Sequence, residues 1–409
     1  MNIVLEPGAA ALLDELHRAG FGAYAVGGCV RDSLLGLAPH DWDLCTAARP
    51  GQVMELFGED RCIPTGLQHG TVTVKRDGKL YEITTFRTEG RYSDGRHPDS
   101  VAFVPDLRED LARRDFTINA MAYSAEEGLC DPFGGREDLA RGVVRAVGEP
   151  LRRFGEDALR ILRLYRFAAR FGFAIDEATE AAAKQLASHL DCVSAERIEE
   201  ELNKLLAAPQ PGAYLEPEVL AFVLPELPPE ELTKARRRID ALPAGTEQVS
   251  ARWAALLLPL GETGARKALK RLKCSNARID GAAALVRECG EKTPDTLDKC
   301  DLRLQAKRLL GKYDLHTVQQ LTALWTALAP EEKASFDALR AEAEALTAHG
   351  VCCRISQLAV NGRDLMAAGA APGPGLRRVL EALLEEVITG RLPNEKTELL
   401  AFAAGFSAS

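Results

Sequence analysis

The strand-forming pattern of this 409-residue chain stops near Pro150. Before that point, runs rich in β-branched and aromatic residues occur at 70–74 and 81–86, joined by a polar turn at 76–79. After it, Leu, Ala, Glu, Lys and Arg recur with helical spacing. Strands confined to the first third of a chain indicate an α+β head followed by an all-helical remainder. We therefore predict a small mixed sheet with helices, followed by an all-α neck, body and tail.

Prolines and glycines divide the helical part. Prolines cluster at positions 209, 211, 225, 228 and 229, and a last segment begins near Cys352. A chain of this length exceeds one ordinary core. We expect four parts, with boundaries at 1–147 (head), 148–210 (neck), 211–350 (body) and 351–409 (tail).

The composition is that of an ordinary globular protein, with 46% hydrophobic and 27% charged residues. No apolar run approaches 18 residues, so we expect no membrane span. The first residues have neither a basic start nor a long apolar stretch, so we expect no signal peptide. Ten cysteines without a CxxC pair indicate free thiols and argue against zinc. These observations predict a cytoplasmic protein.

The net charge of −9 counts mildly against nucleic-acid binding, but basic residues gather locally. Six arginines and only two acids lie between positions 151 and 170. Further basic clusters lie at 234–238, 266–273 and 307–312. Each cluster is either a solvated helix face or part of a surface that binds nucleic acid.

Two carboxylates, Asp41 and Asp43, are separated by one residue. If they stand on a strand, both side chains point to one face, where they repel unless a cation lies between them. Mg²⁺ prefers such hard oxygen ligands and keeps part of its shell for water and phosphate. The pair therefore suits phosphoryl transfer, in which metal ions activate an attacking hydroxyl and hold the leaving pyrophosphate. The alternative is a solvent-exposed turn, because this spacing is common by chance.

A glycine turn precedes the carboxylates. Residues 24–26 read as a short apolar strand, two glycines follow, and residues 30–35 are predicted as a helix. Glycine lets the backbone approach phosphate oxygens closely, and a helix N-terminus offers free N–H groups to an anion. We therefore expect Gly28 and the charged fork of Arg31 to bind the phosphates of a nucleotide.

The stretch Gly27-Gly28-Cys29-Val30-Arg31-Asp32, followed by Asp41-Trp42-Asp43, resembles the signature of class II tRNA nucleotidyltransferases and bacterial poly(A) polymerases. That family lies within the DNA polymerase β-like superfamily, so the resemblance implies a polymerase-β-like nucleotidyltransferase head. It also implies a third carboxylate on a neighbouring strand, for which Glu82 is the candidate. By this resemblance Asp41, Asp43 and Glu82 are catalytic and bind Mg²⁺. The alternative for Glu82 is an exposed strand residue.

A second stretch, 113–122, matches the family's second motif almost letter for letter. We predict a helix from Asp115 to Tyr123, in which the acid suits the helix dipole. The resemblance implies that Arg114 contacts the nucleotide, that Asp115 orders the ribose site and that Asn119 supports them. A charged acceptor beside a donor fork can read a 2′-hydroxyl, which both donates and accepts.

A third stretch, 152–160, contains Asp157 and Arg160, which are neighbours if both stand on one helix. They are either a plain ion pair or a reader of the nucleotide base. An Asp acceptor beside an Arg donor suits cytosine and adenine, and it rejects guanine and uracil, whose donor and acceptor are reversed. The stretch resembles the family's Glu-Asp-x-x-Arg motif, which implies selection of CTP and ATP. In the family, residues matching Arg163 and Arg166 also face the nucleotide.

Three further segments resemble parts of the family. The loop 87–104 is similar to the flexible loop that accompanies addition of the final A. The stretch 195–205 resembles the fifth motif, and we expect its charges to brace the neck and the base-reading pair. The segment 358–378 looks like the family's tail. Its glycine turns and two arginines either hold RNA phosphates or form an ordinary helical hairpin.

The resemblance implies an enzyme that adds C, C and A to the 3′ end of tRNA from CTP and ATP, with Mg²⁺, and releases pyrophosphate. The neck, body and tail would bind the acceptor and T arms by shape and phosphate contacts. The rivals are a poly(A) polymerase and an A-adding or CC-adding partial enzyme. Outside the enzyme class, the rival is an RNA-binding chaperone. The oligomeric state stays open.

Overall fold

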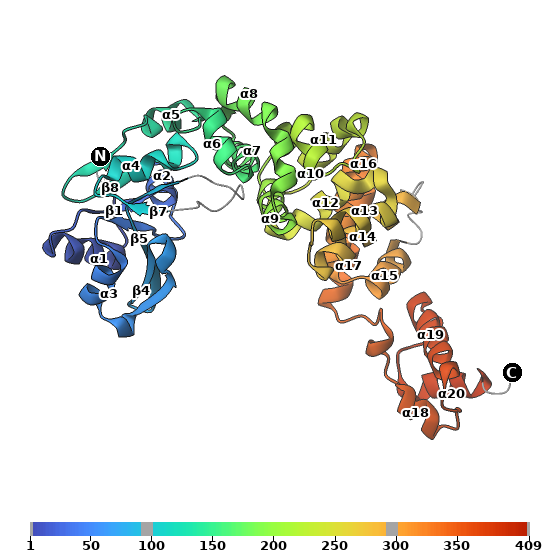
Figure 1. The fold of residues 1–409 in the computed structure, drawn as a ribbon. Coiled ribbons are helices and arrows are strands. Elements are labelled where there is room, and N and C mark those ends of the chain that lie inside the picture. Colours follow the sequence, from blue (N-terminus) through green and yellow to red (C-terminus); the bar gives the residue numbers. More distant parts are fainter. Residues whose placement is uncertain (1–2, 91–100, 292–301, 407–409) are drawn as a thin grey trace. The chain divides into compact units, whose positions relative to one another are not determined.

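The computed structural model describes residues 3–90, 101–291 and 302–406 (Figure 1). The chain forms two compact units, residues 1–229 with 271–273 and residues 230–270 with 274–409. The finer division at residues 147, 210 and 350 remains our proposal. In the described part of the chain, no helix is both long enough and apolar enough to cross a membrane.

A seven-stranded mixed sheet forms the centre of the first unit, in the order β3-β4-β5-β2-β1-β8-β9 (Figure 1). All neighbours are antiparallel except β2 and β5, which run parallel. The predicted hairpin is confirmed, and its turn residues Asp77 and Gly78 have φ of 49° and 76°, as a tight hairpin turn requires. The strands are β1 (Ala23–Val26), β2 (Leu44–Thr46), β3 (Cys62–Gly66), β4 (Thr71–Arg76), β5 (Lys79–Thr85), β8 (Ala122–Ser124) and β9 (Gly128–Cys130).

Short helices surround this sheet and complete the predicted α+β head. The apolar side of one of them, at Leu12, Leu13 and Leu16, is buried. A separate strand pair, β6 (Arg87–Glu89) with β7 (Val101–Phe103), flanks residues 91–100, so most of the loop predicted at 87–104 lies outside the described residues. The helices are α1 (Pro7–Arg18), α2 (Gly28–Leu34), α3 (Pro50–Phe57), α4 (Leu107–Ala112) and α5 (Gly135–Arg141).

The predicted helix from Asp115 to Tyr123 is wrong. Thr117–Asn119 makes a single 3₁₀ turn, and Ala122–Ser124 forms β8, which pairs with β1. Ala120, Met121 and Ala122 are all fully buried. Burial of consecutive residues suits a central strand, and this packing overrides the helical propensity of the segment.

Helices dominate after residue 150, as predicted. Among the described residues beyond 150, the exception is β11 (Ala174–Ile175), which pairs with β10 (Val143–Val144). The remaining helices of the first unit are α6 (Pro150–Glu156), α7 (Leu159–Phe171), α8 (Glu177–Gln185), α9 (Ala195–Leu206) and α10 (Pro217–Val223).

The second unit is helical where the structure describes it. Its last part has its own apolar core around Leu365, Leu383 and Leu399, and the helix predicted in the tail is confirmed as α19. The helices are α11 (Leu232–Asp240), α12 (Val249–Leu257), α13 (Gly261–Arg271), α14 (Asn276–Glu291), α15 (Leu302–Lys312), α16 (Leu315–Leu328), α17 (Lys333–Ala348), α18 (Gly362–Ala367), α19 (Pro374–Thr389) and α20 (Lys396–Phe406).

Candidate active site

The glycine turn joins β1 to α2. Gly27 has φ of 79° and ψ of −123°, a conformation that L-residues with a side chain rarely adopt. A Cβ at Gly27 would also lie 2.9 Å from Nη1 of Arg114, so the guanidinium rests directly on the turn. α2 begins at Gly28, two residues before the predicted start.

The carboxylates do not stand on a strand, which corrects the prediction. Asp41 and Asp43 lie in the segment just before β2, although the carbonyl of Asp43 still accepts from the backbone N–H of Val26 at 3.0 Å. The parallel register Leu44↔Ile83 sets Asp43 beside Glu82. Leu44 and Ile83 are buried, so the carboxylates of the two preceding residues share the opposite, more open face.

The electrostatics of Asp43 favour a bound cation. The side chain is exposed, yet the protein groups around it partly desolvate the carboxylate and raise its pKa; the negative charges of Glu82 and Asp41 raise it further, while Arg114 opposes them. A hard divalent cation would relieve this repulsion, so the donor chemistry of Asp43 and Glu82 fits a metal such as Mg²⁺.

Asp41 lines the same cavity as Asp43, but its carboxylate is paired with a neighbouring histidine. Its Oδ2 lies 2.9 Å from Nδ1 of His40, and both side chains are largely exposed. Within the described ranges, no three or more His, Cys, Asp or Glu side chains are placed to hold a metal ion. The structure therefore joins Asp43 with Glu82 and leaves Asp41 at the edge of the site.

Arg31 is engaged inside the protein. It is buried, its Nε donates to Asp32 Oδ1 at 2.8 Å, and its Nη1 donates to Asn119 Oδ1 at 2.5 Å. Its guanidinium carbon also lies 4.9 Å from the ring centroid of Phe171 on α7. Burial lowers its pKa. Arg31 lines the site, but its guanidinium group is hydrogen-bonded to Asp32 and Asn119.

The predicted ribose-reading group is tightly assembled. Asp115 is buried, and its Oδ2 accepts from Nε and Nη2 of Arg163 at 2.8 and 2.5 Å. Its Oδ1 accepts from Nδ2 of Asn119 at 3.1 Å. Burial would raise the pKa of Asp115, but the charge of Arg163 and the Asn119 hydrogen bond outweigh it, and the pKa lies well below its ordinary value.

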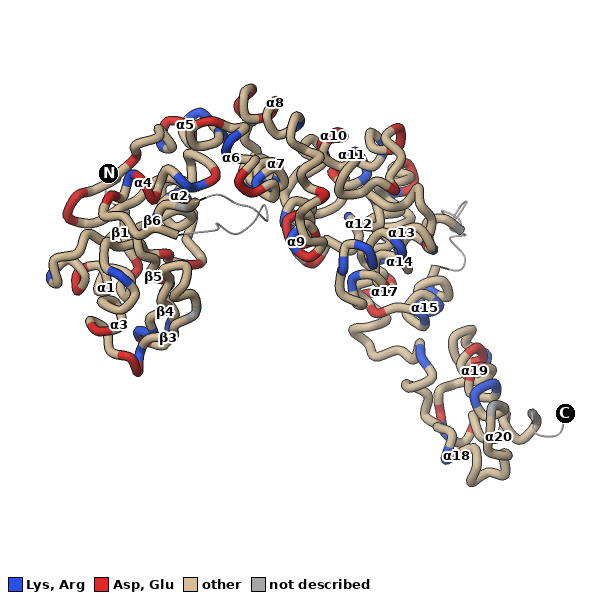
Figure 2. The backbone as a smooth tube through the Cα atoms, in the orientation of Figure 1, with Lys and Arg blue, Asp and Glu red and all other residues tan. Residues whose placement is uncertain are grey.

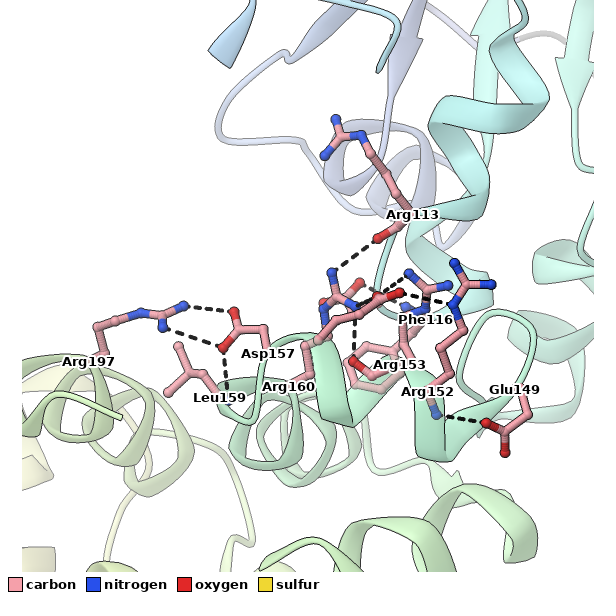
Figure 3. Close-up of polar contacts among 11 residues, drawn as sticks. Arg113, Phe116, Glu149, Arg152, Arg153, Asp157, Leu159, Arg160 and Arg197 are labelled. Carbon is pink, nitrogen blue, oxygen red and sulfur yellow. Dashed lines mark hydrogen bonds and ion pairs between the residues drawn. The ribbon is translucent and has the colours of Figure 1, made fainter. Parts of the chain in front are cut away.

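The predicted base-reading pair does not lie on one helix, and the two residues do not pair with each other. Asp157 ends α6 in an extended conformation, whereas Arg160 stands in the first turn of α7 (Figure 3). Nη1 of Arg160 donates to Glu156 Oε2 at 2.8 Å, and Nη2 donates to the carbonyl of Arg113 at 3.1 Å. The plain intrahelical ion pair is thereby excluded.

Charges from α9 brace this region, as expected for the stretch 195–205. Arg197 Nη2 donates to Asp157 Oδ2 at 2.8 Å (Figure 3), and Arg166 forms a 2.6 Å ion pair with Glu201. Burial lowers the pKa of Arg166 to about 10, although Glu201 opposes the shift. The sequence did not lead us to place Arg197 in the site, and its position in the fifth motif was the available signal.

One cavity of about 620 Å³ collects these groups. Its lining includes every predicted site residue except Glu82, which stands on the adjacent strand. The positively charged wall suits a triphosphate, and Asp157 and Arg160 lie in the same cavity as Asp43. The lining residues that were not predicted as site residues are Gly27, Arg113, Leu159, Phe167, Arg170, Arg197 and Lys204.

Sequence profiles of three families match this chain. The Poly A polymerase head domain matches residues 23–145, the probable RNA and SrmB-binding site of polymerase A matches residues 172–228, and tRNA nucleotidyltransferase domain 2 matches residues 245–403.

Full-length relatives and solved structures agree with these profiles. The CCA-adding enzyme of Limosilactobacillus fermentum is 38% identical, with 96% of this chain and 95% of that protein covered. The Latilactobacillus sakei enzyme is 39% identical, with 96% of each covered. The crystal structure of the Bacillus stearothermophilus CCA-adding enzyme in complex with CTP matches with a TM-score of 0.80 and 34% identity, over 99% of this chain and 98% of that chain. The chain described here belongs to the CCA-adding enzyme family.

Proposed function

We propose that this protein adds C, C and A to the 3′ end of tRNA, taking CTP and ATP and releasing pyrophosphate. The observation that carries the proposal is the single cavity that holds a phosphoryl-transfer carboxylate, Asp43, together with a donor and an acceptor suited to C and A, Arg160 and Asp157. The similar proteins support the proposal, since one of them is a CCA-adding enzyme whose structure was solved in complex with CTP. We place it in the cytoplasm on its free cysteines.

The transfer chemistry belongs to the carboxylates. Asp43 and Glu82, joined by Asp41 once it turns from His40, would hold Mg²⁺. When bound, the metal makes the tRNA 3′-hydroxyl a better nucleophile and stabilises the leaving pyrophosphate. Gly28 lets the triphosphate approach the backbone, and the buried charge of Arg31 lies beside it.

The nucleotide is chosen by two groups of residues that line the cavity. Asp115 accepts from the ribose hydroxyl and Arg114 contacts the nucleotide, while Asn119 fixes Asp115. Asp157 accepts from the base amino group, and Arg160 donates to the adjacent ring nitrogen. Arg197 orients Asp157, and Glu156 orients Arg160. Since Asp157 and Arg160 do not pair with each other, both can bind the same base.

The remaining parts serve the tRNA. Arg163 and Arg166 complete the positive wall of the cavity. The neck, body and tail, at 148–210, 211–350 and 351–409, would bind the acceptor and T arms. A helical, shape-reading surface with phosphate contacts is the expected mode for duplex RNA.

The test uses tRNA that ends before its CCA, incubated with each nucleoside triphosphate alone and with CTP and ATP together. Three added nucleotides from the mixture, none from UTP or GTP, are expected. Unlimited addition of A from ATP alone would indicate a poly(A) polymerase, and addition that stops at CC or requires a CC end would indicate a partial enzyme. Binding without transfer in the presence of Mg²⁺ would indicate an RNA chaperone.

A further inference from the structure

Asp110 is a fully buried carboxylate at the edge of the active site, on α4. Its Oδ1 accepts two hydrogen bonds, from the backbone N–H of Arg87 at 3.2 Å and from Nε of Arg113 at 2.9 Å. Its Oδ2 is buried and has no hydrogen-bond partner among the described residues. A buried carboxylate oxygen without a partner is unfavourable, so its retention calls for an explanation.

The side chain that faces this oxygen is Arg114. Nη2 of Arg114 lies 3.6 Å from Asp110 Oδ2, and this is the one ion pair that Arg114 makes within the described ranges. Nε of Arg114 is also buried without a hydrogen-bond partner. The other end of the guanidinium rests on Gly27, where a Cβ would come within 2.9 Å. Arg114 is therefore held between Asp110 and the glycine turn, at the wall of the cavity.

Asp110 is also linked to the base-reading residue Arg160, through its Oδ1 and Arg113. The side chain of Arg113 is fixed on Oδ1, while the backbone carbonyl of Arg113 accepts from Arg160 at 3.1 Å. Figure 3 shows this carbonyl facing Arg160 and the guanidinium of Arg113 pointing away. The two carboxylate oxygens of Asp110 thus serve two different arginines.

We propose that Asp110 is a positioning residue for sugar selection: through Oδ2 it fixes Arg114 against the glycine turn, so that the site prefers ribonucleotides over deoxyribonucleotides. This proposal rests on the proposed function, because it assigns Arg114 to the nucleotide. Asp110 itself touches no substrate, since it is fully buried.

Asp110→Asn tests the role of Oδ2 separately. The amide oxygen must face Arg87 and Arg113, because the reverse orientation would set an NH₂ group against two donors. The NH₂ group then faces Arg114, donor against donor. We expect kcat/KM for CTP relative to dCTP to fall about tenfold, the size of one interaction with a charged group. The ratio for CTP relative to UTP should stay unchanged, because the interaction of Arg113 with Arg160 is kept.

A matched control is Glu6→Gln, at a part-buried carboxylate of the same unit that holds Tyr81 and caps α1. It should leave both ratios unchanged. If Asp110→Asn fails to fold, Asp110→Glu shifts the charge by one methylene and should lower the same ribose ratio. An unchanged ribose ratio, or a parallel fall of both ratios, overturns the proposal. A wild-type protein that transfers neither CTP nor ATP would instead refute the proposed function.

Discussion

Two carboxylates of one cavity, Asp43 and Asp115, have pKa values that are shifted in opposite directions. Partial desolvation and the nearby charges of Glu82 and Asp41 raise the pKa of Asp43, whose side chain is exposed. Burial acts the same way on Asp115, but Arg163 outweighs it and lowers the pKa. The first environment favours a cation, and the second holds a permanent acceptor. Two aspartates thereby differ in function because the residues around them differ.

Asp115→Asn should destabilise the protein at neutral pH by roughly 3 kcal/mol, because it removes one member of a buried ion pair. Because the pKa of Asp115 is lowered in the folded protein, its ionised form stabilises the fold when the pH is above 3.8, the ordinary pKa of an aspartate. This stabilisation is lost as the pH falls below 3.8. The difference between variant and wild type should therefore be constant from pH 7 to 5 and shrink below pH 3.8. Urea unfolding across this range measures it, and a difference that does not depend on pH contradicts the ion-pair account.

At the scale of elements, the sequence predicts the helices and strands whose structure depends on their own local residue pattern. The hairpin β4–β5 follows from two runs rich in β-branched and aromatic residues joined by a polar turn, and α19 follows from helical spacing after glycines. The segment 115–123 could not be predicted, because the strand at its end depends on pairing with β1 on one side and β9 on the other. The break between α6 and α7 was missed for a similar reason, since Arg197 of α9 helps hold Asp157 outside both helices.

The site was more predictable than its elements. Every predicted residue except Glu82 lines one cavity. The sequence motifs identify the reactive side chains, and the turns and helix ends on which they stand bring them together. The partners of those residues were less predictable. Glu156 holding Arg160 and Asp110 facing Arg114 depend on side-chain packing between segments, which a single sequence does not display.

The turn between β1 and α2 gives a test at this scale. Gly27→Ala should raise KM for CTP and ATP about tenfold, because its methyl group would displace Arg114. Gly36→Ala is the matched control. Gly36 has φ of 72°, so alanine is also strained there, but nothing lies within 4 Å of the added Cβ. Both variants should lose stability, and steady-state kinetics should show a raised nucleotide KM for Gly27→Ala alone. Equal KM values would contradict the role of the turn.

At the scale of the whole molecule, charge is dispersed. The net charge is −9, and Figure 2 shows Lys and Arg interspersed with Asp and Glu along the helices. Several residues of the basic clusters pair with acids, as Arg266 does with Asp280 and Arg308 with Glu385. Binding of RNA must then come from individual exposed cations. The start of α19 offers two, Arg378 and Arg377, of which Arg377 forms a solvent-exposed ion pair with Glu381 at 2.9 Å.

The double variant Arg377→Ala, Arg378→Ala should weaken tRNA binding and leave KM for CTP unchanged. If both side chains bind phosphates, the slope of log Kd against log salt should fall by about one for each phosphate that is no longer neutralised. Titration of labelled tRNA at several salt concentrations measures this slope. Arg391→Ala, which removes a cation paired with Glu386 in the same tail, is the control. An unchanged slope would make the tail an ordinary helical hairpin.

The central claim is that transfer and base choice reside in different residues of one cavity. The direct measurement is equilibrium binding of CTP, ATP, UTP and GTP to the Asp43→Asn variant in the presence of tRNA. The variant should transfer no nucleotide, yet it should bind CTP and ATP at least about tenfold more tightly than UTP and GTP, through Asp157 and Arg160. Equal binding of all four nucleotides, or transfer by this variant at the wild-type rate, would contradict the account.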